Sequence, residues 1–211
     1  MATEGIAGSD GRNRSPAARR IMAAADELFF SRGAAATTVR EITAACGLTP
    51  GALYNHFDSK EDLLFELVIG RHLLLAAKVD AALREEHDDP AARLAAVVRV
   101  FVRVHTRPGA RQGARVANRE YRSLGPARRA QVVAVRRTLR NQVRDVLAEG
   151  VGRGTFSLAG GGDSTSATLA ASAIIDMCVH ATEWLRADGP LTLNAVEDRY
   201  VEMALRMAGV R

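Results

Sequence analysis

Apolar residues recur at intervals of three and four positions along almost the whole chain, and stretches that alternate Val, Ile or Thr with polar residues are nearly absent. This spacing, with many aliphatic residues and few aromatic ones, predicts an all-α protein. Gly, Pro and polar breaks divide the pattern into about nine helices: 15–33, two short helices within 38–57, then 59–86, 90–106, 110–123, 126–150, 164–187 and 192–209. No repeat of fixed period is visible, so a solenoid is not expected.

Capping signals mark the starts of the first three helices. Ser15-Pro16 and Thr49-Pro50 each place a capping residue before a first-turn proline. Thr38 and Glu41 have the spacing of a capping box, in which the two side chains satisfy each other's backbone amides. Gly47 supplies the positive φ that ends a helix. Two short helices joined by a turn of a few residues are therefore predicted.

The second of these short helices carries small or hydrogen-bonding residues within about two turns, namely Thr49, Gly51, Tyr54, Asn55 and His56. Two helices joined by so short a turn describe a helix-turn-helix, whose second helix enters the major groove of DNA. From spacing alone, an ordinary corner between two helices of a core fits as well.

The flanking residues suit a phosphate backbone. Thr38 and Arg40 open the first short helix, whose N-terminal amides favour an anion, and Lys60 begins the following helix. The formal net charge is +5, and all cationic residues except Lys60 and Lys78 are arginine. This charge permits nucleic acid binding without requiring it, because a GC-rich genome also favours Arg and Ala.

The run TVREITAACGLTPGALYNHFDSKEDLL, with RRIMAAADELFFSRG upstream, resembles the DNA-binding domain of the TetR family of bacterial transcriptional regulators. The matching features are Leu-Phe-x-x-x-Gly, Thr-x-x-x-Ile, the Gly before the turn, Tyr-x-His-Phe and Lys-x-x-Leu. The resemblance implies a homodimer with one N-terminal helix-turn-helix head per subunit. The expected divisions are a flexible arm at 1–14, a DNA-binding domain at 15–75 with its motif at 38–57, and a ligand-binding and dimerisation domain at 76–211.

The resemblance assigns phosphate contacts to Tyr54, His56 and Lys60, and places Thr49, Pro50, Gly51 and Asn55 nearest the bases. The predicted DNA-binding residues are Thr38, Arg40, Thr49, Pro50, Gly51, Ala52, Tyr54, Asn55, His56 and Lys60. Arg12 and Arg14 either reach DNA from the arm or belong to a charged tail with no such role.

The C-terminal part resembles, more loosely, a subgroup of this family that governs fatty-acid and sterol breakdown and senses acyl-CoA esters. An acyl-CoA ester is therefore one expected effector. In the helix from about 126, arginines lie on a face next to an apolar stripe, and this face either binds a CoA phosphate or is solvated. These arginines are Arg129, Arg136, Arg137, Arg140 and Arg144.

The implied ligand pocket lies among the middle and later helices. Its candidate residues are Phe101, His105, Asn118, Tyr121, Met177, His180 and Trp184, each of which also fits ordinary core packing. Candidates for the dimer seam are Trp184, the helix from Ala167, and Val196, Tyr200 and Leu205.

Other classes of protein lack support. The chain has no HExxH, GxSxG, Walker-type loop or Cys-His cluster, so neither catalysis, a metal site nor a cofactor is predicted. The glycines at 150–154 follow a helix rather than a strand and indicate a helix terminator rather than a phosphate-binding loop.

Cys46 and Cys178, without a CxxC pair or a secretory start, favour a reducing cytoplasm. Charged residues interrupt the most apolar stretch, 63–83, and argue against a membrane span.

These observations predict a regulator that represses by binding a palindromic DNA operator as a dimer and is released by a small hydrophobic effector. Two alternatives stay open. One is a constitutive DNA-binding protein without an effector, and the other is a small-molecule binding module with no DNA role. The long C-terminal part argues against the first alternative, and the helix-turn-helix pattern argues against the second.

Overall fold

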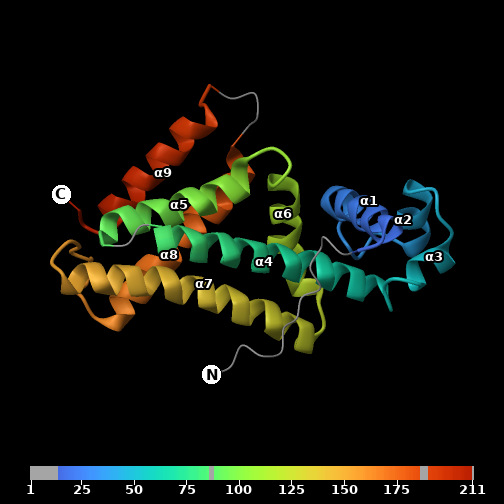
Figure 1. Ribbon diagram of the computed structural model, residues 1–211, viewed down its shortest axis with the longest axis horizontal. Coiled ribbons are helices and arrows are strands. Elements are labelled where there is room, and N and C mark those ends of the chain that lie inside the picture. Colours follow the sequence, from blue (N-terminus) through green and yellow to red (C-terminus); the bar gives the residue numbers. More distant parts are fainter. Residues whose placement is uncertain (1–13, 86–87, 186–189, 211) are drawn as a thin grey trace. The chain divides into compact units, whose positions relative to one another are not determined.

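The computed structural model describes residues 14–85, 88–185 and 190–210. Within these ranges the chain forms nine α-helices and no strand, and the all-α prediction is confirmed (Figure 1). The elements are α1 Pro16–Arg32, α2 Val39–Ala45, α3 Pro50–Tyr54, α4 Lys60–Glu85, α5 Pro90–Thr106, α6 Arg111–Glu120, the 3₁₀ turn η2 Tyr121–Ser123, α7 Pro126–Gly152, α8 Ser164–Trp184 and α9 Leu193–Met207.

Most predicted helix starts are capped as expected. The hydroxyl of Ser15 accepts a hydrogen bond from the Ala18 amide at 3.1 Å. Ser59, which precedes α4 and has acidic residues after it in the sequence, also acts as a cap, since its hydroxyl accepts a hydrogen bond from the Asp62 amide at 3.0 Å. Thr49 occupies the predicted N-cap position before Pro50, but its side chain makes no capping hydrogen bond. The five-residue α3 is instead held by burial of one apolar residue, Leu53.

The chain divides into two compact units. The first contains the described residues up to His72 together with Arg115–Val132, and the second contains Leu73–Ala114 and the described residues from Val133 onward. The first unit therefore includes the end of α6, η2 and the start of α7 as well as α1 to α3. Its most buried large side chains include Ile21, Phe29, Ile42, Leu53 and Phe57.

In the second unit, α5 packs alongside α8 and α9 (Figure 1). Their core is built from aliphatic residues and a few aromatic ones, among them Val98, Phe101, Ile174, Val196 and Tyr200. Arg111 of α6 adds a polar tie, since its guanidinium donates to the Thr182 carbonyl at 2.6 and 3.2 Å. This tie leaves the last turn of α8 with a bonded carbonyl, as a helix end requires.

Both cysteines are free thiols. Cys178 is buried in the core of the second unit, and burial raises the pKa of its thiol to about 12. Cys46 is half-buried just beyond α2, with its sulfur near the Ile42 and Thr43 carbonyls. Among the residues that the structure describes, no helix is both long and apolar enough to cross a membrane.

Candidate DNA-binding surface

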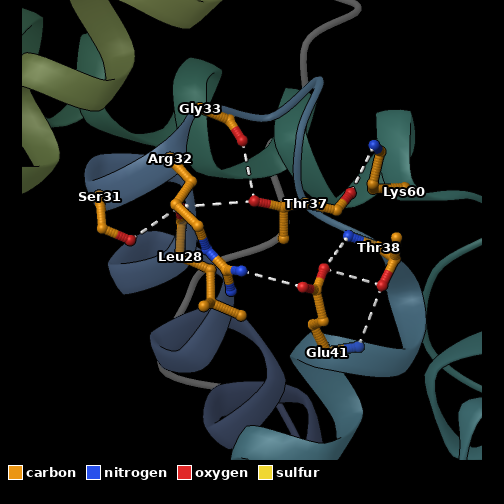
Figure 2. Close-up of polar contacts among 8 residues, drawn as sticks. All are labelled: Leu28, Ser31, Arg32, Gly33, Thr37, Thr38, Glu41 and Lys60. Carbon is orange, nitrogen blue, oxygen red and sulfur yellow. Dashed lines mark hydrogen bonds and ion pairs between the residues drawn. The ribbon is translucent and has the colours of Figure 1, made fainter.

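The start of α2 is fixed by the predicted capping box, which is confirmed (Figure 2). The hydroxyl oxygen of Thr38 accepts a hydrogen bond from the Glu41 amide at 3.2 Å, and the Glu41 carboxylate accepts one from the Thr38 amide at 2.7 Å. Arg32 pairs with the same carboxylate at 2.9 Å. The hydrogen bond from the Thr38 amide is the main cause that lowers the pKa of Glu41. The amides of Thr38 and Glu41 are thus already satisfied inside the protein.

The turn between α2 and α3 is short and well bonded. Gly47 has φ 64°, a value that L residues with side chains rarely adopt. The amide of Leu48 reaches back to the Thr43 carbonyl at 2.8 Å, and Arg20 of α1 donates to the Cys46 carbonyl. These bonds fix where α3 begins.

The exposed side of α3 carries most of the predicted DNA-binding residues. Leu53 is fully buried and Phe57, just beyond the helix, is 2% exposed, so these two side chains set which face points inward. Tyr54 is 56% exposed. The other exposed positions of this segment are Thr49, Pro50, Gly51, Asn55 and His56, whereas Ala52 is half-buried. A side chain at Gly51 would meet only the Thr49 hydroxyl, at 4.0 Å, so packing within the chain does not require glycine there.

The predicted cationic contacts differ in their surroundings. Arg40 on α2 is exposed. The Lys60 ammonium, by contrast, donates to the carbonyls of Ala34 and Thr37, each at 2.7 Å. Arg14 pairs with Glu66 at 2.6 Å, with 15% of its side chain exposed, and Arg12 lies outside the described residues. Two of the three N–H groups of Lys60 are therefore used inside the first unit.

Sequence reasoning missed two charged residues at the end of α6. The Glu120 carboxylate, buried in the first unit, accepts hydrogen bonds from the Ala34 amide at 3.3 Å and from Arg119 at 2.8 Å. Arg119 also donates to the carbonyls of Phe29 and Phe30 in the last turn of α1. No local sequence pattern marks this contact, since 86 positions separate Ala34 from Glu120.

The predicted pocket residues do not all belong to one unit. Asn118 and Tyr121 are in the first unit, and the other five are in the second. Phe101 and His105 are buried, whereas His180 and Trp184 are exposed. Met177 is half-buried. The pocket stays a prediction.

The arginine face of α7 is only partly exposed. Arg129 and Arg137 are exposed, and Arg136 and Arg140 are half-buried. The fifth member, Arg144, is half-buried and pairs with Asp145 at 2.6 Å.

A capped α2, a tight turn and an α3 with an exposed polar face define a helix-turn-helix. Residues 21–67 match the family described as bacterial regulatory proteins of the tetR family, and residues 87–208 match the tetracyclin repressor-like C-terminal domain. Since the second match alone covers more than half of the chain, the protein belongs to the TetR family, as its sequence resemblance predicted.

Similar proteins include solved structures and curated repressors. A bacterial regulatory protein in the tetR family from Rhodococcus RHA1 is 34% identical, with 94% of this chain and 100% of that chain covered and a TM-score of 0.83. The transcriptional repressor KstR2 of Rhodococcus jostii is 28% identical, with 93% of each chain covered. AibR, solved in complex with isovaleryl coenzyme A and operator DNA, is 26% identical, with 89% of this chain and 97% of that chain covered and a TM-score of 0.79. These relatives are transcriptional regulators rather than enzymes.

Proposed function

We propose that the protein is a dimeric transcriptional repressor that binds a palindromic DNA operator through α3 and is released by a small hydrophobic effector. The observation that carries the proposal is the fixed orientation of α3. Burial of Leu53 and Phe57 turns Thr49, Gly51 and Asn55 outward together with Tyr54, which is 56% exposed. A polar helix face without large charged side chains suits close approach to a groove floor.

The exposed residues divide into two roles in this proposal. Tyr54, His56 and Arg40 contact phosphates, because a phenol, an imidazole and a guanidinium donate hydrogen bonds to anionic oxygens. Thr49, Pro50, Gly51, Ala52 and Asn55 lie nearest the base edges, where amide and small side chains read sequence. Thr38 contributes by fixing the start of α2.

Exposed apolar side chains on α8 and α9 support a dimer. Leu169, Trp184, Met203 and Met207 are 66%, 53%, 40% and 39% exposed. Trp184 also stacks on Tyr200, with ring centroids 6.3 Å apart. Large apolar groups of this kind pair across a two-fold axis, and such a dimer reads half-sites whose centres lie about 34–36 Å apart.

An acyl-CoA ester is the effector class that we infer for this chain. AibR, a similar protein, was solved with isovaleryl coenzyme A and operator DNA. The half-buried arginines of α7 provide guanidinium groups that bind phosphate well. Because acyl-CoA esters and DNA are intracellular, this proposal places the protein in the cytoplasm.

A gel-shift titration against the DNA upstream of its own gene tests the proposal. A sequence-specific complex whose affinity falls on addition of acyl-CoA esters is the expected result. If a specific complex forms but neither acyl-CoA esters nor co-purified small molecules weaken it, the protein is a constitutive DNA-binding protein. Failure to form any specific complex at low salt would leave a small-molecule binding module and overturn the repressor proposal.

A further inference from the structure

The turn between α1 and α2 is bonded to charged side chains from outside the helix-turn-helix. Lys60, the first residue of α4, donates from Nζ to the carbonyls of Ala34 and Thr37 at 2.7 Å each, and Figure 2 shows the second of these bonds. Ala34 is 4% exposed and Thr37 is fully buried. Buried carbonyls need partners, and a single ammonium provides one for both.

The same turn is bonded from α6. Glu120 Oε2 accepts the hydrogen bond of the Ala34 amide at 3.3 Å, and Arg119 holds the other carboxylate oxygen at 2.8 Å. Both backbone polar groups of Ala34 are therefore bonded to charged side chains, its carbonyl to Lys60 and its amide to Glu120. A lysine and a glutamate that are 60 positions apart in sequence meet at one buried residue.

This turn leads directly into the start of α2. Gly33 has φ 84°, and the Thr37 hydroxyl donates to the Gly33 carbonyl at 2.8 Å, which closes the turn (Figure 2). The next residue is Thr38, which carries the capping box with Glu41. A shift of Ala34 or Thr37 would thus move the first residue of α2, and with it the short turn that carries α3.

We propose that Lys60 and Glu120 are positioning residues for DNA binding, which set operator affinity by holding the Gly33–Thr38 turn rather than by touching DNA. The inference rests on the proposed DNA-binding function. In this role the Lys60 ammonium donates to backbone carbonyls of the protein. It therefore does not bind a DNA phosphate and does not release a counterion from it.

Charge alone predicts the opposite sign for Glu120. Loss of a negative charge from a DNA-binding head favours DNA, because it reduces repulsion of the phosphates. Positioning predicts weaker binding, since the Ala34 amide loses its acceptor and Arg119 keeps only its bonds to the α1 carbonyls. The direction of the change therefore separates the two accounts.

The test compares full-length variants on operator DNA by fluorescence anisotropy across a salt series, at a temperature where circular dichroism shows each to be folded. Lys60→Met should weaken binding about tenfold and leave the slope of log K against log salt unchanged. Arg40→Ala, at an exposed cation of the same head, should reduce that slope by about 0.9. Glu120→Ala should weaken binding although a negative charge is lost. Lys60→Arg, which keeps a cationic donor, should bind more tightly than Lys60→Met and less tightly than the wild type.

Three results would overturn the inference. One is a slope reduced by about 0.9 in Lys60→Met, which marks a direct phosphate contact. The others are unchanged affinity in folded Lys60→Met and tighter binding by Glu120→Ala. If Lys60→Met does not fold, Lys60→Gln is read by the same slopes, because its side chain is neutral but still donates. If wild-type protein binds no operator, it is the proposed function that fails.

Discussion

The carboxylate of Glu197 on α9 lies against the guanidinium of Arg103 on α5, with Oε2 and Nε 2.8 Å apart. The glutamate side chain is only 2% exposed, whereas the arginine is 46% exposed. Arg107, just beyond the C-terminal end of α5, lies 3.3 Å from the other carboxylate oxygen. The buried charge is therefore compensated twice, and the pair ties α5 to α9.

This double compensation predicts non-additive substitutions. Arg103→Ala and Arg107→Ala should each be tolerated, because the remaining arginine still pairs with the buried carboxylate. The double variant leaves that carboxylate unpaired, and its free energy of unfolding should fall by about 3–5 kcal/mol, well beyond the sum of the single changes. Urea denaturation of the four proteins measures the coupling, and additive effects would contradict it.

The stability of the second unit should fall on mild acidification because of His105. Its side chain is buried, with Nδ1 2.7 Å from the Phe101 carbonyl. Burial lowers the pKa of His105, and electrostatic interactions with Arg136 and His180 lower it further, although the bond to Phe101 acts the other way. The unfolded chain therefore binds a proton more readily than the folded one. The contribution of neutral His105 to folding stability is fully present at pH values above its ordinary pKa of 6.5. It is lost as the pH falls from there through the lowered pKa.

His105→Gln should remove that part of the pH dependence. Denaturation profiles at a series of pH values below 7 measure it, with His56→Gln, an exposed position, as the matched control. A His105→Gln profile as steep as that of the wild type would show that another group causes the loss.

Removal of the α2 cap should weaken both stability and DNA binding. Thr38→Ala loses the hydroxyl that accepts from the Glu41 amide, and the expected cost is about 1 kcal/mol. Thr38→Ser keeps that oxygen and serves as the control. Since the pKa of Glu41 is lowered, its contribution to folding stability is present above pH 4.5 and is lost as the pH falls through the lowered pKa. Chemical denaturation of both variants at neutral and acidic pH checks these expectations.

Local signals in the sequence were enough to predict several features of the first unit. The capping box of Thr38 and Glu41 and the glycine with positive φ at position 47 need only neighbouring residues, and both are present. Thr49 shows the limit of such signals, because a capping residue before proline does not guarantee a capping bond. The exposure of Tyr54 also follows from the spacing of the buried Leu53 and Phe57.

Features that depend on distant residues were not predictable in this way. The contact of Glu120 with Ala34 joins α6 to the α1–α2 turn, and no periodicity or cap reveals it. For the same reason the inclusion of Arg115–Val132 in the first unit has no sequence signal. A phosphate contact was predicted for Lys60 from its place at the start of a helix and from the family resemblance, whereas its bonds to two carbonyls depend on the fold.

The α3 surface makes a prediction about two neighbouring residues. Tyr54→Ala should weaken binding to cognate and non-cognate DNA to a similar extent, because a phosphate contact carries no sequence information. Asn55→Ala should change the preferred sequence, and a base contact is expected to contribute about 1–3 kcal/mol of discrimination. Tyr54→Phe, which removes only the hydroxyl, is the control. Selection of binding sites from a random DNA library with each variant separates these effects.

The most direct test of sequence-specific binding is the ratio of affinities for the operator and for a scrambled duplex of equal length, measured with wild-type protein at near-physiological salt. We expect the operator to bind at least about 10³-fold more tightly, as specific regulators do. Equal affinity for the two duplexes would show that the exposed face of α3 does not read sequence, and would contradict the proposed function.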